Sequence, residues 1–306
     1  MLIHPGPADR QRIQVVRCRA HPVCQRLRAG LPLDPAIAAA ARDAGIAAAW
    51  LTLDDLRCDR LSFVILAPPP GDGRVAFYSD TRTLGPGARI ISAGLHLGQG
   101  GDIHAHGLWT DAAGVLHMGH LHPEATHLSR DACITGWQLD GAIFRRLPDA
   151  ETGFALLRPV PTRRRLPGGL PARHVRLRPN LDLVPMIAAM MQTRTPVQNL
   201  GSLVGTQFAT GAPLPGPATE ILILGQDRTS LHVASVGRSG TVRQGVLSRQ
   251  NMICITAELL LIDAHQSLNH PTLCMRTREA RTTQGGTAMS GGNGMSSLRI
   301  HPPEFC

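Results

Sequence analysis

The spacing of apolar residues predicts a mainly β structure with one helix in the first half of the chain. Alternating apolar positions indicate a strand over residues 12–19, and apolar runs indicate strands over residues 46–53, 61–66, 88–97 and 132–139. Between the first two strands, Leu33-Asp34-Pro35 precedes an alanine-rich segment. This pattern predicts a helix with Asp34 as its N-cap and Pro35 at its first position, ending at Gly45.

Residues 103–123 read I-H-A-H-G-L-W-T-D-A-A-G-V-L-H-M-G-H-L-H-P, which predicts a β-hairpin. Two mostly apolar arms flank residues 110–114, which carry the Asp and Gly of a tight turn. With Gly114 in the left-handed conformation, Asp111 faces Val115. His106 then lies opposite His120.

The same register places His104 opposite His122. Opposed residues, and residues two apart on one strand, share a face of the sheet, so four imidazoles are expected on one side of the hairpin. A bulge at Gly114 would shift the register, and His122 is the least secure of the four. His117 is expected on the other face with Trp109, in a structural role.

Histidine clusters bind zinc, nickel, copper or iron, whereas magnesium and calcium prefer carboxylates. Six of the fourteen histidines lie between His104 and His127. Three histidines with an open fourth position are typical of a catalytic or ligand-accepting zinc. We therefore predict that His104, His106 and His120 bind Zn²⁺ or another divalent transition metal, with His122 as a fourth ligand or a neighbour of the ligands.

The amino-acid composition limits the classes to which the protein can belong. The 306 residues, 43% of them hydrophobic, suffice for two packed domains, and no apolar run reaches the length of a membrane span. The N-terminus lacks the pattern of a secretory signal, and the seven scattered cysteines include no C-x-x-C. A cytoplasmic protein with reduced thiols and no membrane partner is therefore predicted.

The formal net charge of +9 invites a nucleic-acid partner. Every basic side chain apart from histidine is arginine, which, with abundant Ala, Gly and Pro, is typical of a GC-rich genome and weakens that argument. Aromatic residues make up only 3% of the chain, so a base-stacking platform is not expected. The R-G-R-P core of AT-hooks is absent.

The order H-A-H, short turn, G-H-L, apolar strand and P-D-A-E-T-G-F (residues 148–154) resembles the PPC domain, conserved in plants and prokaryotes. The resemblance covers residues 101–159 and implies an α/β domain with an antiparallel sheet, often assembled as a trimer. In prokaryotic members, the histidines matching His104, His106 and His120 resemble a metal-binding triad. Plant members accompany DNA-binding AT-hooks.

A second copy of this pattern follows. Residues 199–205 resemble the Gly-Ser strand of PPC domains, and residues 252–258 resemble the closing strand. Shifted by 126 residues without gaps, the hairpin aligns with a later segment in which His232 matches His106. The other two triad positions hold Ser230 and Val246, so the second copy is expected to be metal-free. Its best polar candidates for a function are Arg249, Asn251 and Glu258.

The predicted fold class is thus α/β (α+β), with two tandem PPC-like domains, each a mainly antiparallel sheet with one or two flanking helices. The first domain spans residues 1–160 and holds the histidine cluster; a linker rich in Pro, Gly and Arg spans 161–172. The degenerate second domain spans 173–263. Residues 264–306 lose all periodicity and are expected to form a disordered tail.

Three functions stay open at this stage. The first is a metal-binding protein whose ion takes a small or anionic ligand, and the second a DNA-associated regulator. The third is a zinc-dependent hydrolase or lyase that uses the open coordination position, with Asp102, Glu124 or His122 nearby for acid–base chemistry. A fully coordinated zinc that only clamps the hairpin would be structural. Self-association, as a homotrimer, is expected from the family resemblance.

Overall fold

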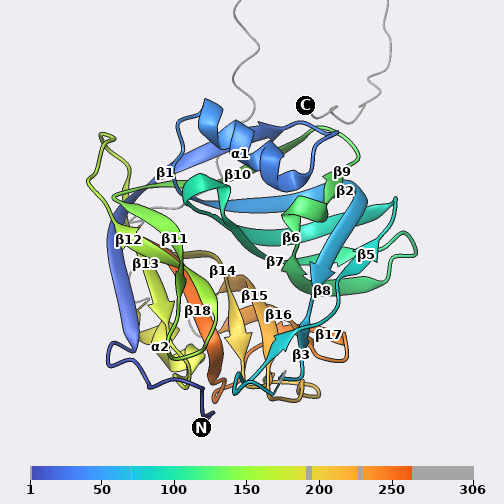
Figure 1. The fold of residues 1–306 in the computed structure, drawn as a ribbon, viewed down its shortest axis with the longest axis vertical. Helices are drawn as coiled ribbons and strands as arrows, with labels where there is room; N and C mark the ends of the chain where they lie inside the picture. Colours follow the sequence, from blue (N-terminus) through green and yellow to red (C-terminus); the bar gives the residue numbers. More distant parts are fainter. Residues whose placement is uncertain (1, 70, 191–194, 227–229, 264–306) are drawn as a thin grey trace, which may run out of the picture. The chain divides into compact units, whose positions relative to one another are not determined.

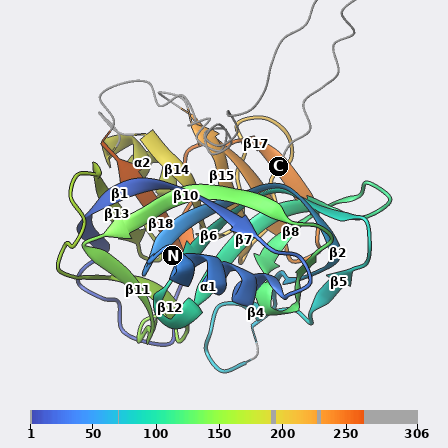
Figure 2. The same ribbon diagram turned by 90° about the horizontal axis from the view of Figure 1, so that it is seen from above.

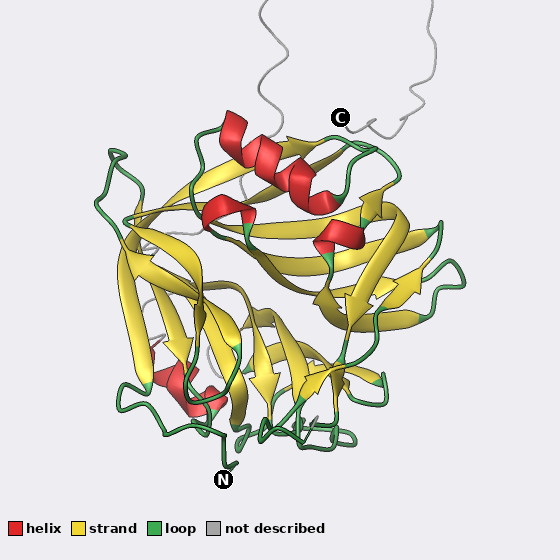
Figure 3. Cartoon of the chain, in the orientation of Figure 1, coloured by secondary structure: helices red, strands yellow, loops and turns green. Residues whose placement is uncertain are grey.

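The computed structural model describes residues 2–69, 71–190, 195–226 and 230–263. The predicted tail lies outside these residues. Strands dominate the described residues, which contain one α-helix in each half (Figures 1 and 3). Among the described residues, no helix is long and apolar enough to cross a membrane.

The first half contains one large set of strands with one helix. In chain order these are β1 (Ile13–Leu27), α1 (Leu33–Asp43), β2 (Ala49–Val64), β6 (Ala88–Leu97), β7 (Ile103–Thr110), β8 (Leu116–Leu121) and β10 (Ala132–Asp140). Shorter additions are β3 (Leu66–Ala67), β4 (Phe77–Tyr78), β5 (Arg82–Leu84), β9 (His127–Leu128) and the hairpin of β11 (Ala142–Pro148) and β12 (Ala155–Pro161).

The second half repeats the large set without the additions. It consists of β13 (Leu170–Leu177), α2 (Leu183–Met190), β14 (Thr195–Leu203), β15 (Thr219–Gln226), β16 (Leu231–Gly237), β17 (Val242–Val246) and β18 (Ile253–Ile262). In space the first set runs β8-β7-β6-β2-β10-β1 and the second runs β17-β16-β15-β14-β18-β13. The two orders match strand by strand, which confirms two tandem units of one fold.

The register confirms the repeat at the level of single residues. His106 pairs with His120 between β7 and β8, and His232 pairs with Val246 between β16 and β17, at the shift of 126 that aligns the two sequences. We refer to the two sets of strands, with their helices, as the first and second repeat.

Strands β1 and β13 pair antiparallel and join the repeats into one continuous sheet. Val15 lies opposite Val175 in this pair. Strand β13 begins at Leu170, within the segment predicted as a linker, because its first residues already pair with β1. Figure 2 shows β1 between β13 and β10.

The repeats also pack through their other strands. β15 contacts β7, and β16 contacts β8. Three side chains of the second repeat, Leu222, Ala234 and Val236, belong to the same buried cluster as Trp109 of the hairpin. Burial of this apolar surface, worth roughly 25 cal/mol per Å², fixes the second repeat against the hairpin.

Two local predictions were wrong. Helix α1 begins at Leu33 with Pro32 as the N-cap, so Asp34 lies in the first turn. The cause is tertiary: the Leu33 N–H donates to the Thr126 carbonyl at 2.8 Å, which fixes the entry of the chain. The strands predicted over 46–53 and 61–66 form the single strand β2, which passes through Asp55 at a φ of 54°.

The P-D-A-E-T-G-F segment forms the turn between β11 and β12, and its acidic side chains bind arginines of the second repeat. Asp149 is fully buried and accepts from Arg176 at 2.8 Å, Arg178 at 3.0 Å and Arg158 at 2.6 Å. Burial would raise the pKa of Asp149, but the hydrogen bond and charge of Arg176, aided by Arg178, lower it overall. This ion cluster ties the first repeat to β13.

We predict that Asp149→Asn destabilises the protein by about 3–5 kcal/mol at pH 7, because buried arginines lose their counter-charge. A lowered pKa in the folded state means that the carboxylate stabilises the fold above its unfolded pKa of about 3.9, and that this stability is lost as the pH falls below that value. The free energies of unfolding of the wild type and the variant, measured with urea, should therefore become similar in acid.

Asp131→Asn is the control, since Asp131 and its partner Arg26 are exposed at 44% and 72% of their side-chain areas. Its effect on the free energy of unfolding should be much smaller than that of Asp149→Asn, because solvent screens the exposed pair. Equal costs for the two variants would contradict the assignment of the buried cluster.

Candidate metal centre

The hairpin that carries the histidines has the predicted register. The Asp111 N–H donates to the Val115 carbonyl at 3.1 Å, and Gly114 adopts a φ of 81°. His106 and His120 are directly opposed on β7 and β8. The next pair toward the turn is Gly107 and Gly119, which face the other side of the hairpin.

Three of the predicted histidines come together. The ring centroids of His104 and His106 are 5.1 Å apart, those of His104 and His120 5.0 Å, and those of His106 and His120 5.5 Å. One nitrogen of each ring lies within 4.8 Å of the other two. Ligand nitrogens around a tetrahedral zinc are roughly 3.4 Å apart, for bonds of about 2.0–2.1 Å. Small ring rotations would therefore suffice to fit an ion.

The electrostatics of the cluster also suit a metal. Burial lowers the pKa of His106 to about 3 and holds the pKa of His120 well below its usual value, with the neighbouring His104 adding to both effects. Both imidazoles are thus neutral, as metal binding requires. The buried Nδ1 of His120 has no hydrogen-bond partner among the described residues. An unsatisfied buried nitrogen of this kind fits a ligand atom.

The two histidines on β7 are each contacted by an acceptor from the second repeat. The Nδ1 of His104 lies 3.3 Å from Oε2 of Glu258 on β18. The Nδ1 of His106 lies 3.2 Å from the carbonyl oxygen of Ile221 on β15.

Glu258 also contacts a further histidine. Its Oε2 lies 2.9 Å from the Nδ1 of His96, which pairs with His104 across β6 and β7. His96 and Glu258 are both fully buried, and with His104 they form a second group of possible metal ligands. Burial would raise the pKa of Glu258, but His104 and His96 lower it well below its usual range.

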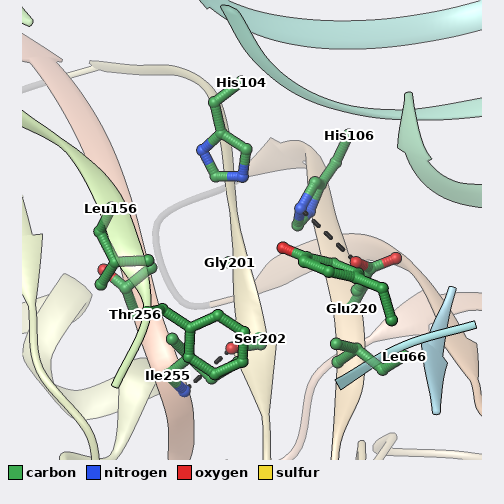
Figure 4. Close-up of a pocket in the computed structure, with 11 residues that line it drawn as sticks. Leu66, His104, His106, Leu156, Gly201, Ser202, Glu220, Ile255 and Thr256 are labelled. Atoms are coloured by element: carbon green, nitrogen blue, oxygen red, sulfur yellow. Dashed lines mark hydrogen bonds and ion pairs between the residues drawn. The ribbon is translucent and has the colours of Figure 1, made fainter. Parts of the chain in front are cut away.

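A small pocket opens beside His104 and His106, between the two repeats (Figure 4). Its volume is about 30 Å³, room for one or two waters. Glu220 of β15 lines it, with Oε1 3.9 Å from the Nε2 of His106. Burial raises the pKa of Glu220 to about 8. The other lining residues are Leu66, Tyr78, Phe154, Leu156, Gly201, Ser202, Ile255 and Thr256.

The remaining predicted site residues are not among the grouped ligands. His122 is outside both histidine groups, although its ring centroid lies 6.2 Å from that of His120. Its Nδ1 is 3.1 Å from Glu124, and its backbone N–H donates to Ser62 just after β8, whose end pairs with β2. Asp102 faces Arg146 at 3.5 Å on the surface. Neither Asp102 nor Glu124 lines the pocket.

The polar candidates of the second repeat have different surroundings. Arg249 is exposed. Asn251 is buried and binds the backbone of Gln207 through both ends of its amide, at 2.9 and 3.0 Å, which is a structural role in a loop. Of these three residues, only Glu258 contacts a histidine of the cluster.

Sequence reasoning missed His96 and Glu220. A signal for Glu220 exists: it is a carboxylate within the otherwise apolar strand A-T-E-I-L-I-L, as Glu258 is within I-T-A-E-L-L-L. A charged residue in a buried strand needs a partner. His96 carries no such signal, because its approach to Glu258 depends on the packing of distant strands.

No family model matches this sequence, and no curated protein matches it. Several solved structures resemble parts of it. A plant- and prokaryote-conserved (PPC) protein from Pyrococcus horikoshii shares 19% identity over 47% of this chain and 96% of its own, with a TM-score of 0.35. A protein from Archaeoglobus fulgidus, called metal-containing, shares 18% over 52% of this chain and 99% of its own, with a TM-score of 0.36.

A protein from Ralstonia eutropha, named provisionally as DNA-binding, shares 19% identity over 48% of this chain and 89% of its own, with a TM-score of 0.33. Each of these structures corresponds to about half of this chain. Sequence identities and TM-scores this low do not indicate a function for this chain.

We predict that Gly119→Ala displaces His120. A Cβ at this position would lie 2.3 Å from the Val64 carbonyl oxygen, so β8 would have to move away from β2. Overpacking of this kind costs roughly 1–3 kcal/mol. The melting temperature of Gly119→Ala should therefore lie below that of the wild type.

Gly85→Ala is the matched control, because a Cβ there meets nothing within 4 Å. It should be neutral or should raise stability by up to about 1 kcal/mol, since alanine restricts the unfolded chain. A stable Gly119→Ala protein would show that β8 is not held as closely as described.

Proposed function

We propose that His104, His106 and His120 bind one divalent transition-metal ion, zinc in the first instance, and that this ion takes a small ligand from the pocket between the repeats. The observation that carries the proposal is the convergence of three imidazoles with one nitrogen each within 4.8 Å of the others. The burial of His106 and His120, which lowers the pKa of both imidazoles, supports it further.

The surroundings favour a ligand-accepting ion over a purely structural one. His122 would complete a closed four-histidine site, but it lies beside Glu124. The pocket at His104 and His106 offers the ion a fourth position instead. Three neutral imidazoles leave the charge of a divalent ion uncompensated, which favours an anionic oxygen ligand there.

A second candidate is a zinc-dependent hydrolase or lyase, and Glu220 is the observation that favours it. A bound ion would lower the pKa of a water and polarise a carbonyl or phosphoryl oxygen. Glu220 lines the same pocket and lies within 3.9 Å of His106, so it could hold or accept a proton there. Loss of turnover but not of metal in Glu220→Gln would identify this function.

Association with DNA stays a prediction from the charge of +9 and the family resemblance. A linear fall of log affinity with log salt concentration would test it. The homotrimer and the cytoplasmic location likewise stay predictions.

We predict about one metal ion per chain in the untagged protein, measured by inductively coupled plasma mass spectrometry. His104→Ala and His120→Ala should each reduce the content to near zero, because two imidazoles hold zinc far more weakly than three. The control is His117→Ala: His117 lies on the same hairpin but contacts Asp111 at 3.2 Å, outside the cluster.

Wild-type protein without metal after reconstitution, or unchanged metal content in both triad variants, would refute the proposed site. Equal loss in His117→Ala would point to general disruption of the hairpin.

A further inference from the structure

The second repeat has lost two of the three triad histidines, yet it places a buried glutamate against the triad of the first repeat. We propose that Glu258 is a positioning residue for the metal centre: it holds the Nδ1–H of His104 and so directs the Nε2 lone pair of that ring to the ion. The inference rests on the proposed function and extends it, because the metal centre then consists of both repeats.

The contact geometry fixes the tautomer. Oε2 of Glu258 lies 3.3 Å from the Nδ1 of His104 and 2.9 Å from the Nδ1 of His96. A carboxylate only accepts hydrogen bonds, so a neutral ring keeps this contact favourable by carrying its proton on Nδ1. The Nε2 of His104 then has the free lone pair, and a hydrogen-bonded carboxylate increases the basicity of a ligating imidazole.

His106 shows the same arrangement with a different acceptor. Its Nδ1 faces the carbonyl oxygen of Ile221 at 3.2 Å, which leaves Nε2 unprotonated. Both ligands on β7 are therefore oriented by strands of the second repeat, β18 for His104 and β15 for His106. Orientation of the two rings depends on the docking of one repeat against the other.

The cost of burying a carboxyl group indicates that packing alone does not explain Glu258. It lies fully buried in β18, where every residue is buried and most are apolar. Removing a carboxyl group from water is unfavourable, and a buried polar group that lacks partners destabilises a fold. The Oε1 atom has no hydrogen-bond partner among the described residues, so the cost is only partly offset. A role in orienting His104 accounts for a glutamate at this position.

The first test compares zinc affinity by competition with a chromogenic chelator in the full-length protein. Glu258→Leu removes the acceptor and should weaken binding roughly 10- to 100-fold. Glu258→Gln keeps the shape and a neutral acceptor, so its loss should be smaller. Glu151→Gln is the matched control, because Glu151 is a buried carboxylate outside both histidine groups that pairs with Arg12 at 2.8 Å and Arg178 at 3.3 Å. The zinc affinity of this variant should stay within about 2-fold of wild type.

The second test reads the tautomer directly. Two-bond ¹H–¹⁵N spectra of the metal-free wild type, with His104 assigned by its absence in His104→Gln, should show the Nδ1–H form. This form leaves the Nε2 lone pair free for an ion, as the positioning role requires. The measurement needs no Glu258 variant, so it stands even if Glu258→Leu does not fold.

The outcomes separate the two proposals. Wild type that binds no zinc overturns both. Zinc that is lost in His104→Ala but held within 2-fold by both Glu258 variants leaves the triad intact and overturns the positioning role. An Nε2–H form of His104 in the metal-free protein overturns it as well.

Discussion

The antiparallel pairing of β1 with β13 is the interaction on which the rest of the structure depends. It continues one sheet from the first repeat into the second and leaves the closing strand β18 next to β13. The contacts of β15 with β7 and of β16 with β8 complete the arrangement. The histidine hairpin is thereby covered by strands whose sequence lies more than a hundred residues away. The buried cluster of Asp149 with Arg176 and Arg178 holds the same junction from the β11–β12 turn.

Much of the first repeat could be predicted from the sequence because its information is local. The register of the hairpin follows from a period of two residues and from a glycine at the turn, and both are visible in the order of residues. The strand β6 and the repeat of the fold could be predicted for the same reason. The start of α1 could not, since the hydrogen bond from Leu33 to Thr126 is set by a distant segment.

Only the part of the candidate site that lies close together in the sequence could be predicted. His104, His106 and His120 lie on two adjacent strands, whereas Glu220 and Glu258 reach them through packing between repeats. Periodicity carries no information about such contacts. Both carboxylates are charges within apolar strands, yet only Glu258 was singled out from the sequence. Which histidines the two carboxylates face depends on the pairing of β1 with β13. Asp102 and Glu124, close to the triad in sequence, turn outward because their segments lie at the ends of strands.

The small size of the pocket has a kinetic consequence. An ion held by His104, His106 and His120 would lie between strands of the first and second repeats, with a pocket of about 30 Å³ beside it. A hydrated ion or a chelator is larger than this space, so exchange has to wait for a local separation of β15 from β7. Such openings occur with free energies up to that of global unfolding. Release of the metal would then follow the opening rate of the protein, and a stronger chelator would not accelerate it.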